Sequence, residues 1–483
     1  MNKKIIFYTI KTILSLEILF LVMPLLISFY YQENWRLKFS YIITMFLIFL
    51  FIKILPKEKP KGEKVFTKEG FAIVSLSWIF MSLFGALPFY ISGEVPSYID
   101  SIFEVVSGFT TTGATVIPDI EVISKSLLFW RSFTLFIGGM GMLVLVIAII
   151  PQTDNASNYI LKAEVPGPTF GKLVSKMSYN SRILYLIYLA LTIILIVFLK
   201  LAGMPLFDAI IHSFGVAATG GFSVKNSSVA YYNNGTVEYI LAVGMLIFGI
   251  NFNIFYFIII GKFKEFLKNE ELKWYISIIF ISFLLICLNL FPNYKSFELL
   301  VRDVFFTVSS LITSTAYATV NFGAWPLFSQ IILLFLIFVG GCAGSTAGGL
   351  KISRVIILGK IFLRTIKKMS SPNRKLTVQM NGKKLTNELE GSVTNYLLVY
   401  INFFVILLII LSLEIPDFFS CFSAAAAIIN NAGTGFGIVG PEYNYSSFSD
   451  ATKIIITFYM LLGRLEIFPL LIIFSASLYR NKR

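Results

Sequence analysis

The chain has 483 residues, of which 57% are hydrophobic and 14% are charged, and its mean hydropathy is +0.80. A soluble domain carries about 25% charged residues, and the apolar residues here form long runs, which indicates a polytopic membrane protein. A single histidine, His212, and three cysteines without a CxxC pair argue against a zinc enzyme or a disulfide framework. The net charge of +14 gathers in loops between apolar runs. It therefore predicts cytoplasmic loops and no nucleic-acid binding.

Ten apolar segments are long enough, or nearly so, to cross about 30 Å of hydrocarbon as helices. They lie at about 5–30, 39–55, 70–92, 127–150, 183–203, 236–260, 274–292, 327–340, 394–413 and 452–478. The first resembles a signal sequence, but its apolar run is long and no small-residue cleavage motif follows, so we interpret it as a span. Basic residues concentrate at 56–69, at 351–384 and at the C-terminal end. The positive-inside rule then places both termini and these loops in the cytoplasm.

The connections on the other side share one design, and this internal repeat is the most informative feature of the chain. Each begins with an aspartate, continues as a short apolar segment and reaches small polar residues with glycine. They read D-SIFEVVSGFTTTGATV from Asp100, D-AIIHSFGVAATGGFSV from Asp208, D-VFFTVSSLITSTAYATV from Asp303 and D-FFSCFSAAAAIINNAGTGFGIV from Asp417. We expect each to form a pore helix, capped by its aspartate, and then an irregular segment that lines a cavity.

The pattern predicts an all-α polytopic membrane protein, with two N-terminal helices and four helix–pore-loop–helix repeats around one pseudo-fourfold pore. The N-terminal helices would occupy 1–69, and the repeats 70–181, 182–272, 273–393 and 394–483. The string Thr110–Gly113 can present backbone carbonyls, and a ring of carbonyl oxygens can replace the hydration shell of potassium. The negative ends of the pore-helix dipoles would favour a cation at the same place.

These residues resemble those of the Trk/Ktr/HKT superfamily of potassium transporters, specifically its bacterial TrkH branch, over essentially the whole chain. The most specific pieces are SGFTTTGAT (107–115), GGMGMLVLVIAIIP (138–151), AEVPGP (163–168), HSFGVAATGGFS (212–223), GGCAGSTAGGLK (340–351), NNAGTGFG (430–437) and MLLGRLEIF (460–468). The resemblance implies potassium uptake across the bacterial cytoplasmic (inner) membrane. It implies no enzyme activity and no bound cofactor, with potassium as the substrate.

The resemblance also implies which residues line the selectivity filter, and one of them departs from the family pattern. The implied filter residues are Thr110, Thr111, Thr112 and Gly113; Ala218, Thr219 and Gly220; Ser314, Thr315 and Ala316; and Asn431, Ala432 and Gly433. Ala316 stands where the family pattern has glycine, so we expect a filter that prefers potassium but discriminates less sharply. His212 lies in the second pore helix, where we expect a packing or hydrogen-bonding role rather than a pH sensor.

A glycine-rich interruption after the third filter segment and an arginine in the last span are candidate gating elements. The gating residues are Gly340, Gly341, Gly344, Ser345, Thr346, Gly348, Gly349, Lys351 and Arg464. Five glycines in ten residues do not form a stable helix, although glycines also permit close helix packing. A charge in the membrane faces the interior or a cavity, although Arg464 could instead pair with Glu466. The family resemblance implies a mobile loop and an arginine below the filter.

By the same resemblance, the partners are a cytosolic TrkA-type ring with nucleotide-binding RCK domains and a second copy of this chain. The basic loop 351–384 is a candidate docking surface, or else it only sets topology and contacts membrane lipid. Two other classes stay open: a secondary carrier for another cation or solute, and a membrane enzyme. The chain offers a carrier no polar pocket for a large solute, and offers an enzyme few intramembrane carboxylates. The sequence does not distinguish channel-like from proton- or sodium-coupled flux.

Overall fold

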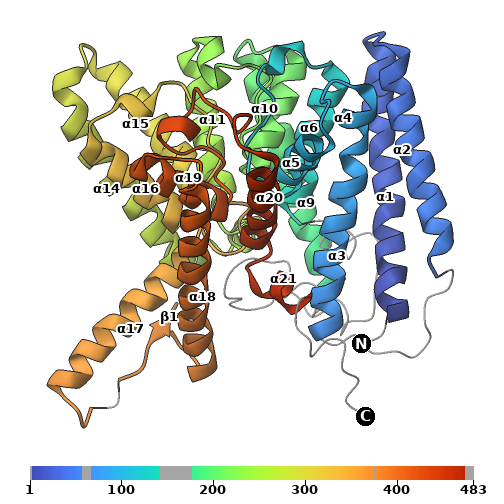
Figure 1. The fold of residues 1–483 in the computed structure, drawn as a ribbon. Helices are drawn as coiled ribbons and strands as arrows, with labels where there is room; N and C mark the ends of the chain where they lie inside the picture. The colour runs from blue at the N-terminus through green and yellow to red at the C-terminus, as the bar shows by residue number, and fades with distance from the viewer. Residues whose placement is uncertain (1–2, 57–66, 142–176, 375, 474–483) are drawn as a thin grey trace.

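The computed structural model describes residues 3–56, 67–141, 177–374 and 376–473, and within them the protein is almost entirely helical (Figure 1). The first six helices are α1 (Lys3–Tyr30), α2 (Trp35–Ile54), α3 (Thr67–Gly85), α4 (Leu87–Ser92), α5 (Tyr98–Phe109) and α6 (Lys125–Gly139). The next eight are α9 (Met177–Leu201), α10 (Leu206–Ala218), α11 (Gly235–Phe248), α12 (Phe252–Ile259), α13 (Phe263–Lys268), α14 (Glu270–Leu290), α15 (Phe297–Ile312) and α16 (Leu327–Val339). The last five are α17 (Ile352–Ser370), α18 (Asn387–Leu411), α19 (Phe418–Ile429), α20 (Asp450–Arg464) and α21 (Phe468–Ile473).

Short elements join these helices. Five 3₁₀ turns lie in the described loops: η1 (Ile120–Val122), η2 (Ser228–Tyr232), η3 (Phe291–Asn293), η4 (Phe322–Ala324) and η5 (Gly437–Val439). Strands β1 (Gln379–Met380) and β2 (Lys383–Lys384) form an antiparallel hairpin. Its two turn residues are Asn381 (φ 51°) and Gly382 (φ 73°). An Asn-Gly pair with two positive φ angles is the favoured two-residue hairpin turn, so the local sequence explains this element.

Six segments of the described chain are long and apolar enough to cross a membrane. They are α1, α2, α3 with α4, α9, α14 with η3, and α18. Each of these six corresponds to one of the expected spans, and they comprise both N-terminal helices and the first helix of every repeat. Membrane-spanning helices with long apolar runs are thus found where the sequence predicts them.

The second helices of the repeats are short, and those of the second and fourth repeats are shorter than the sequence predicts. Helix α16 matches the expected segment 327–340, and the end of the expected segment 127–150 lies outside the described residues. Helices α6, α11, α16 and α20 contain 15, 14, 13 and 15 residues. A helix of 15 residues covers about 22 Å, less than the roughly 30 Å of a hydrocarbon core. The expected single span 236–260 is α11 and α12, which meet at an angle of 93°. The expected span 452–478 likewise ends its first helix at Arg464, and its last residues, 474–483, lie outside the described chain.

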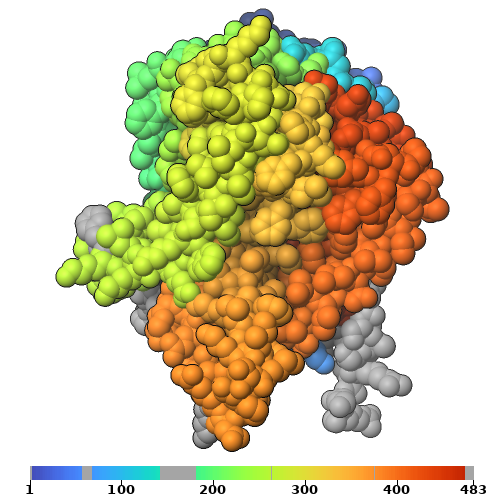
Figure 2. Space-filling model, turned by 90° about the vertical axis from the view of Figure 1, so that its left-hand side faces the viewer, coloured from blue at the N-terminus to red at the C-terminus, as the bar shows by residue number. Residues whose placement is uncertain are grey.

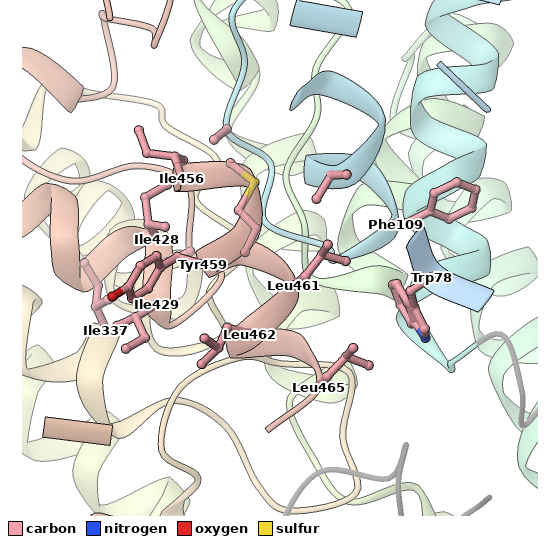
Figure 3. Close-up of a cluster of buried hydrophobic side chains, with 14 of the residues drawn as sticks. Trp78, Phe109, Ile337, Ile428, Ile429, Ile456, Tyr459, Leu461, Leu462 and Leu465 are labelled. Carbon is pink, nitrogen blue, oxygen red and sulfur yellow. The ribbon is translucent and has the colours of Figure 1, made fainter. Parts of the chain in front are cut away.

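Helix α20 lies in the middle of the protein (Figure 1) and carries part of its core (Figure 3). Its side chains Ile456, Tyr459 and Leu462 are buried beside Ile428 and Ile429 of α19. This apolar packing brings the fourth repeat against the first, where Trp78 of α3 and Phe109 of α5 meet edge to face with centroids 6.5 Å apart. Burial of such side chains from water or lipid headgroups holds the pore helices in place.

A basic extension projects from one end of the bundle (Figures 1 and 2). We use this name for α17, the loop after it, the β1–β2 hairpin and the first two turns of α18. The extension lies at the same end of the molecule as the start of α1 (Figure 1). Glu270 of α14 anchors it, because its carboxylate accepts hydrogen bonds from Lys360 Nζ and from the Asn381 amide, the latter at 3.2 Å. The loop 57–66 and the motifs that extend into 142–176 lie outside the described residues.

Candidate functional site

Four short helices, α5, α10, α15 and α19, are the expected pore helices, and only one of them is capped by its aspartate. Asp417 precedes α19 and accepts a hydrogen bond from the Ser420 amide at 2.8 Å. Helices α5 and α15 are capped instead by Ser97 and Ser296, and α10 starts after Pro205. The prediction that every aspartate caps its helix is therefore wrong for three of them, because those helices begin three to seven residues earlier than expected.

The other three aspartates tie the pore helices to neighbouring segments. Asp100 forms an ion pair with Lys453 of α20 at 2.7 Å. Asp208 accepts a hydrogen bond from the Tyr232 hydroxyl at 2.7 Å, and Asp303 accepts one from the Tyr294 hydroxyl at 3.0 Å. Each contact joins a pore helix to another segment of the chain. These carboxylates thus have structural partners.

The segments after the pore helices share one unusual backbone conformation. The first residue with a left-handed backbone is Thr111 (φ 56°), Thr219 (φ 56°), Ser314 (φ 56°) or Asn431 (φ 51°). Two residues later φ is positive again, at Gly113 (77°), Gly221 (64°), Ala316 (61°) and Gly433 (71°). The intervening amides of Thr112, Gly220, Thr315 and Ala432 each donate to a carbonyl five residues earlier, at 2.8–2.9 Å. Left-handed backbone is uncommon outside glycine, so its recurrence shows that the four segments are geometrically equivalent.

This equivalence adds residues that the sequence reading missed. Gly221 corresponds to Gly113 in backbone conformation, whereas Ala218 ends helix α10 and corresponds to Thr110. Thr313 and Asn430 occupy the same position in the third and fourth segments. The sequence ATGGF contains two adjacent glycines, Gly220 and Gly221, and either can be aligned with the glycine of TTTG. This ambiguity was the signal that the sequence offered. Only the φ angles separate the two.

The first segment contacts the second and the fourth, and the second contacts the third, so we refer to the four segments as a ring. A Cβ atom built on Gly113 would lie 1.8 Å from the Gly220 carbonyl oxygen, one on Gly221 would lie 1.7 Å from that of Thr315, and one on Gly433 would lie 2.3 Å from that of Thr112. Real Cβ atoms do not approach oxygen so closely. At these three contacts a glycine is therefore needed both for its φ and for space.

Ala316 occupies the remaining position of this ring. In backbone conformation it corresponds to Gly113, Gly221 and Gly433, and its φ of 61° is left-handed. It therefore carries a methyl group at the position that is glycine in the other three segments. The third segment also carries a hydroxyl pair, Thr313 Oγ1 and Thr315 Oγ1, 2.8 Å apart. The ring is therefore pseudo-fourfold in backbone and unequal in side chains.

Asn431 cross-links the ring to two other elements. Its Nδ2 donates to Thr112 Oγ1 at 2.9 Å and to the carbonyl of Met460 in α20 at 2.9 Å. The neighbouring Asn430 accepts a hydrogen bond from the Tyr400 hydroxyl at 2.9 Å. All of these groups are buried. Buried polar groups need such partners, so the asparagines hold the first and fourth segments in register.

A buried ion pair behind the first segment was not predicted from the sequence. Arg131 of α6 pairs with Glu104 of α5, and both side chains are almost completely buried. Glu104 also accepts from Thr115 Oγ1 at 2.9 Å, and Arg131 donates to the Ser223 carbonyl at 3.1 Å. A buried pair requires good geometry and further hydrogen bonds, both of which are present. The pair therefore connects the residues that follow the first segment with those that follow the second. A charged residue inside the expected span 127–150 was the available signal.

The glycine-rich interruption after α16 forms a loop that is hydrogen-bonded to the base of the ring. The Gly348 amide donates to Ser314 Oγ at 2.6 Å, and the Gly349 amide donates to the Asn430 carbonyl at 3.1 Å. A Cβ atom on Gly348 would lie 2.0 Å from that carbonyl oxygen. Lys351 ends the loop with a φ of 76° and donates from Nζ to the Ala347 carbonyl. The loop thus lies directly beneath the third and fourth segments.

Two residues hold the other side of this loop, Glu271 of α14 and Gly249 at the end of α11. Glu271 of α14 is buried and accepts from the Ala343 amide at 2.7 Å and the Ser353 amide at 3.2 Å. The Cys342 amide donates to the Gly249 carbonyl, at the bend between α11 and α12, at 3.0 Å. Glu271 was missed by the sequence reading, because it sits at the start of an apolar span where a carboxylate is ordinarily solvated.

Arg464 reaches across the molecule below the ring. It is the last residue of α20, and its Nη1 donates to the Thr346 carbonyl in the glycine-rich loop at 3.1 Å. Its Nη2 donates to the carbonyls of Gly138 and Gly139 at the end of α6, the latter at 2.7 Å. Glu466 was the alternative partner that the sequence offered for Arg464. In the structure its carboxylate forms a bidentate ion pair with Arg354 at 2.6 and 3.0 Å. Arg464 therefore links the first repeat to the loop of the third.

His212 is fully buried in α10, in the hydrogen-bonded position expected for it. Its Nδ1 lies 2.8 Å from the Asp208 carbonyl oxygen and its Nε2 lies 3.4 Å from Ser223 Oγ. The ring also contacts Tyr317, with centroids 5.3 Å apart. It therefore packs between the second and third segments. Among the residues that the structure describes, no cluster of histidine, cysteine or carboxylate side chains suits a metal ion.

Apolar helices long enough to span a membrane, together with four matched irregular segments that follow short helices, define an all-helical membrane protein. A family model described as the TrkH cation transport protein matches residues 38–482. The chain therefore belongs to the TrkH family.

Individual relatives agree with this assignment. The chain is 36% identical over 468 residues to the Trk system potassium uptake protein TrkG of Escherichia coli K12, with 95% of each chain covered. It is 34% identical to TrkH of the same strain, covering 95% of this chain and 96% of the relative. The crystal structure of the potassium transporter TrkH from Vibrio parahaemolyticus superposes with a TM-score of 0.88 at 32% identity, covering 99% of this chain and 100% of that one. The expected all-α membrane architecture and the expected family are both confirmed.

Proposed function

We propose that this chain is the ion-conducting subunit of a potassium-uptake system in the bacterial cytoplasmic membrane. The observation that carries the proposal is the ring of four segments with equivalent left-handed backbones at the ends of four pore helices. Their amides turn back toward the pore helices, which leaves carbonyl oxygens to replace the hydration shell of a potassium ion. The pore-helix C-termini contribute negative dipole ends to the same site.

The proposed filter comprises the residues expected from the sequence together with Gly221, Thr313 and Asn430, which the backbone geometry adds. The proposed gate is the glycine-rich loop with Lys351 and Arg464. Arg464 would hold the loop to the end of α6 and place a positive charge on the path of a cation. We also propose, from the family resemblance, that both termini are cytoplasmic, that two copies associate and that a cytosolic TrkA-type ring regulates the gate.

Rescue of a bacterium that lacks potassium uptake tests this function. Cells that express the chain with its matching cytosolic partner should grow at low external potassium, because a carbonyl-lined filter conducts the ion inward along the membrane potential. A vector without the gene is the control, and membrane expression is measured in parallel. Absence of growth with normal expression and the partner present would contradict the proposal.

The second candidate is a pathway that also carries sodium or couples to another ion, and Ala316 favours it. Its methyl group occupies a position that is glycine in the other three segments, where a neighbouring carbonyl oxygen lies too close for a Cβ atom. A filter with one displaced carbonyl fits potassium less closely. The two candidates therefore differ in ion discrimination, which is measurable in cells.

We expect Ala316→Gly to sharpen the preference for potassium. The ratio of rubidium to sodium uptake should rise about fivefold, which corresponds to roughly 1 kcal/mol of discrimination between the two ions. Radiotracer uptake into cells that express the two proteins at equal levels measures the rubidium rate and the sodium rate. Ala318→Gly is a matched control, since Ala318 lies two residues further along the same segment, outside the ring. Identical discrimination in the Ala316→Gly variant and the unaltered protein would show that the methyl group has no role.

A further inference from the structure

The basic extension contains an open pocket of about 900 Å³, and none of the proposed filter or gate residues lines it. It lies between α17, the loop after α17, strand β2 and the first two turns of α18. Figure 2 shows this extension as a mass that projects from the end of the bundle. Contacts of Glu270 with Lys360 and with Asn381 fix both the helix and the hairpin to α14. The pocket is therefore part of a supported structure.

Four cationic side chains line this pocket: Arg364 and Lys368 from α17, Arg374 from the loop and Lys384 from β2. One carboxylate, Glu390, also lines it and pairs with Arg364 at 2.6 Å. The other three cations are exposed, and within the described part of the chain no ion pair is found for them. Like charges that converge on one cavity repel one another, and an anion with several acceptor oxygens offsets that repulsion.

The remaining wall of the pocket also favours an anion. Asn387, the first residue of α18, lines it, and Thr386 caps this helix with its Oγ1 accepting from the Leu389 amide at 3.3 Å. The positive end of the α18 dipole therefore lies at the pocket. Gly391 lines the wall one turn later, and a Cβ atom built there meets no atom within 4 Å. The cavity thus stays open at its α18 side.

We propose that this pocket binds the phosphate group of an anionic ligand at the membrane face of the extension. Arginine presents a fork that matches phosphate oxygens, and lysine supplies point charges around it. The ligand is either the headgroup of an anionic phospholipid or a soluble phosphate compound. The exposed apolar side chains Phe362, Ile366 and Met369 on α17 would accept acyl chains in the first case. This site is independent of the filter and of the gate.

Binding of two probes to the purified full-length protein tests the proposal. The probes are short-chain phosphatidylglycerol, with short-chain phosphatidylcholine as the headgroup control, and sodium pyrophosphate. The altered protein is Lys368→Gln with Lys384→Gln. Its matched control is Lys367→Gln with Lys383→Gln, which removes the same charges from the neighbouring positions of the same helix and strand, outside the pocket. Gly391→Leu fills the cavity without changing any charge.

We expect the pocket variant to weaken binding about tenfold or more, the matched control to weaken it less than about threefold, and Gly391→Leu to weaken it as the pocket variant does. Binding of phosphatidylglycerol alone assigns the site to a lipid headgroup, and binding of pyrophosphate assigns it to soluble phosphate compounds. Equal losses in the two double variants would overturn the proposal in favour of diffuse surface charge. Absence of binding by both probes in the unaltered protein would also overturn it. Thermal unfolding of each variant verifies that it is folded.

Discussion

Gly221→Ala should abolish potassium or rubidium uptake, to below about a hundredth of the original rate, a change of roughly 2.7 kcal/mol. An alanine at φ 64° costs about 1–2 kcal/mol in backbone strain alone. Its Cβ would in addition lie 1.7 Å from the Thr315 carbonyl oxygen, so that oxygen must leave its position in the ring. Rubidium uptake into cells at equal membrane expression measures the effect.

Gly203→Ala is the matched control for this experiment. Gly203 also has a positive φ, of 96°, but a Cβ atom built there meets nothing within 4 Å. The control carries a comparable backbone strain without displacing a carbonyl, and should retain uptake. Ala316 shows that the chain accommodates alanine at the equivalent position of one segment. If Gly221→Ala transports normally, the close approach of the second and third segments has no importance for the filter.

Arg464→Ala should raise the basal ion flux of the protein in the absence of any cytosolic partner. The substitution removes hydrogen bonds from the guanidinium to the Thr346 carbonyl and to the carbonyls at the end of α6, and removes a positive charge below the ring. If the closed state loses about 2 kcal/mol of net stabilisation, the flux should rise about thirtyfold. Rubidium flux into proteoliposomes that contain the purified protein measures it.

Arg464→Lys separates the two contributions of this side chain. Lysine keeps the positive charge, but a single ammonium does not span both the loop and α6 as the planar fork of arginine does. The lysine variant should therefore give a flux between those of the unaltered protein and Arg464→Ala. Unchanged flux in Arg464→Ala, with normal reconstitution, would contradict a role in gating. A flux in Arg464→Lys equal to that in Arg464→Ala would assign the whole effect to the hydrogen bonds.

Much of the candidate site could be predicted from the sequence, because its signals are local. Small polar residues and glycine after a short apolar segment, repeated four times between spans, predict the pore loops, and irregular backbone follows each of the four short helices at these positions. The capping aspartates were mostly misplaced, because a serine upstream competes for the same cap and only the folded helix shows which residue wins.

The contacts that join different repeats could not be predicted. Arg464 and Thr346 lie 118 positions apart in sequence, and Asn431 and Thr112 lie 319 positions apart. No local sequence pattern links residues at such separations. The same holds for Glu271, whose carboxylate turns inward to the glycine-rich loop instead of outward to solvent. The apolar run 236–260 also predicted one continuous helix where the structure has α11 and α12 at an angle of 93°, because the run measures apolar length and carries no information on where neighbouring elements end a helix.

The sequence by itself determined the membrane class of this protein and, through its motifs, the family, and it predicted the four repeats and most positions of the proposed filter, since apolar length and glycine placement act locally along the chain. Only the tertiary structure decided which glycine of the second segment matches Gly113, that Ala316 shares this backbone conformation, and that the expected span 236–260 bends between two helices. The physical reason is that these features depend on how closely backbones from different repeats approach one another. Such distances are fixed by packing around the common axis, which no single segment encodes.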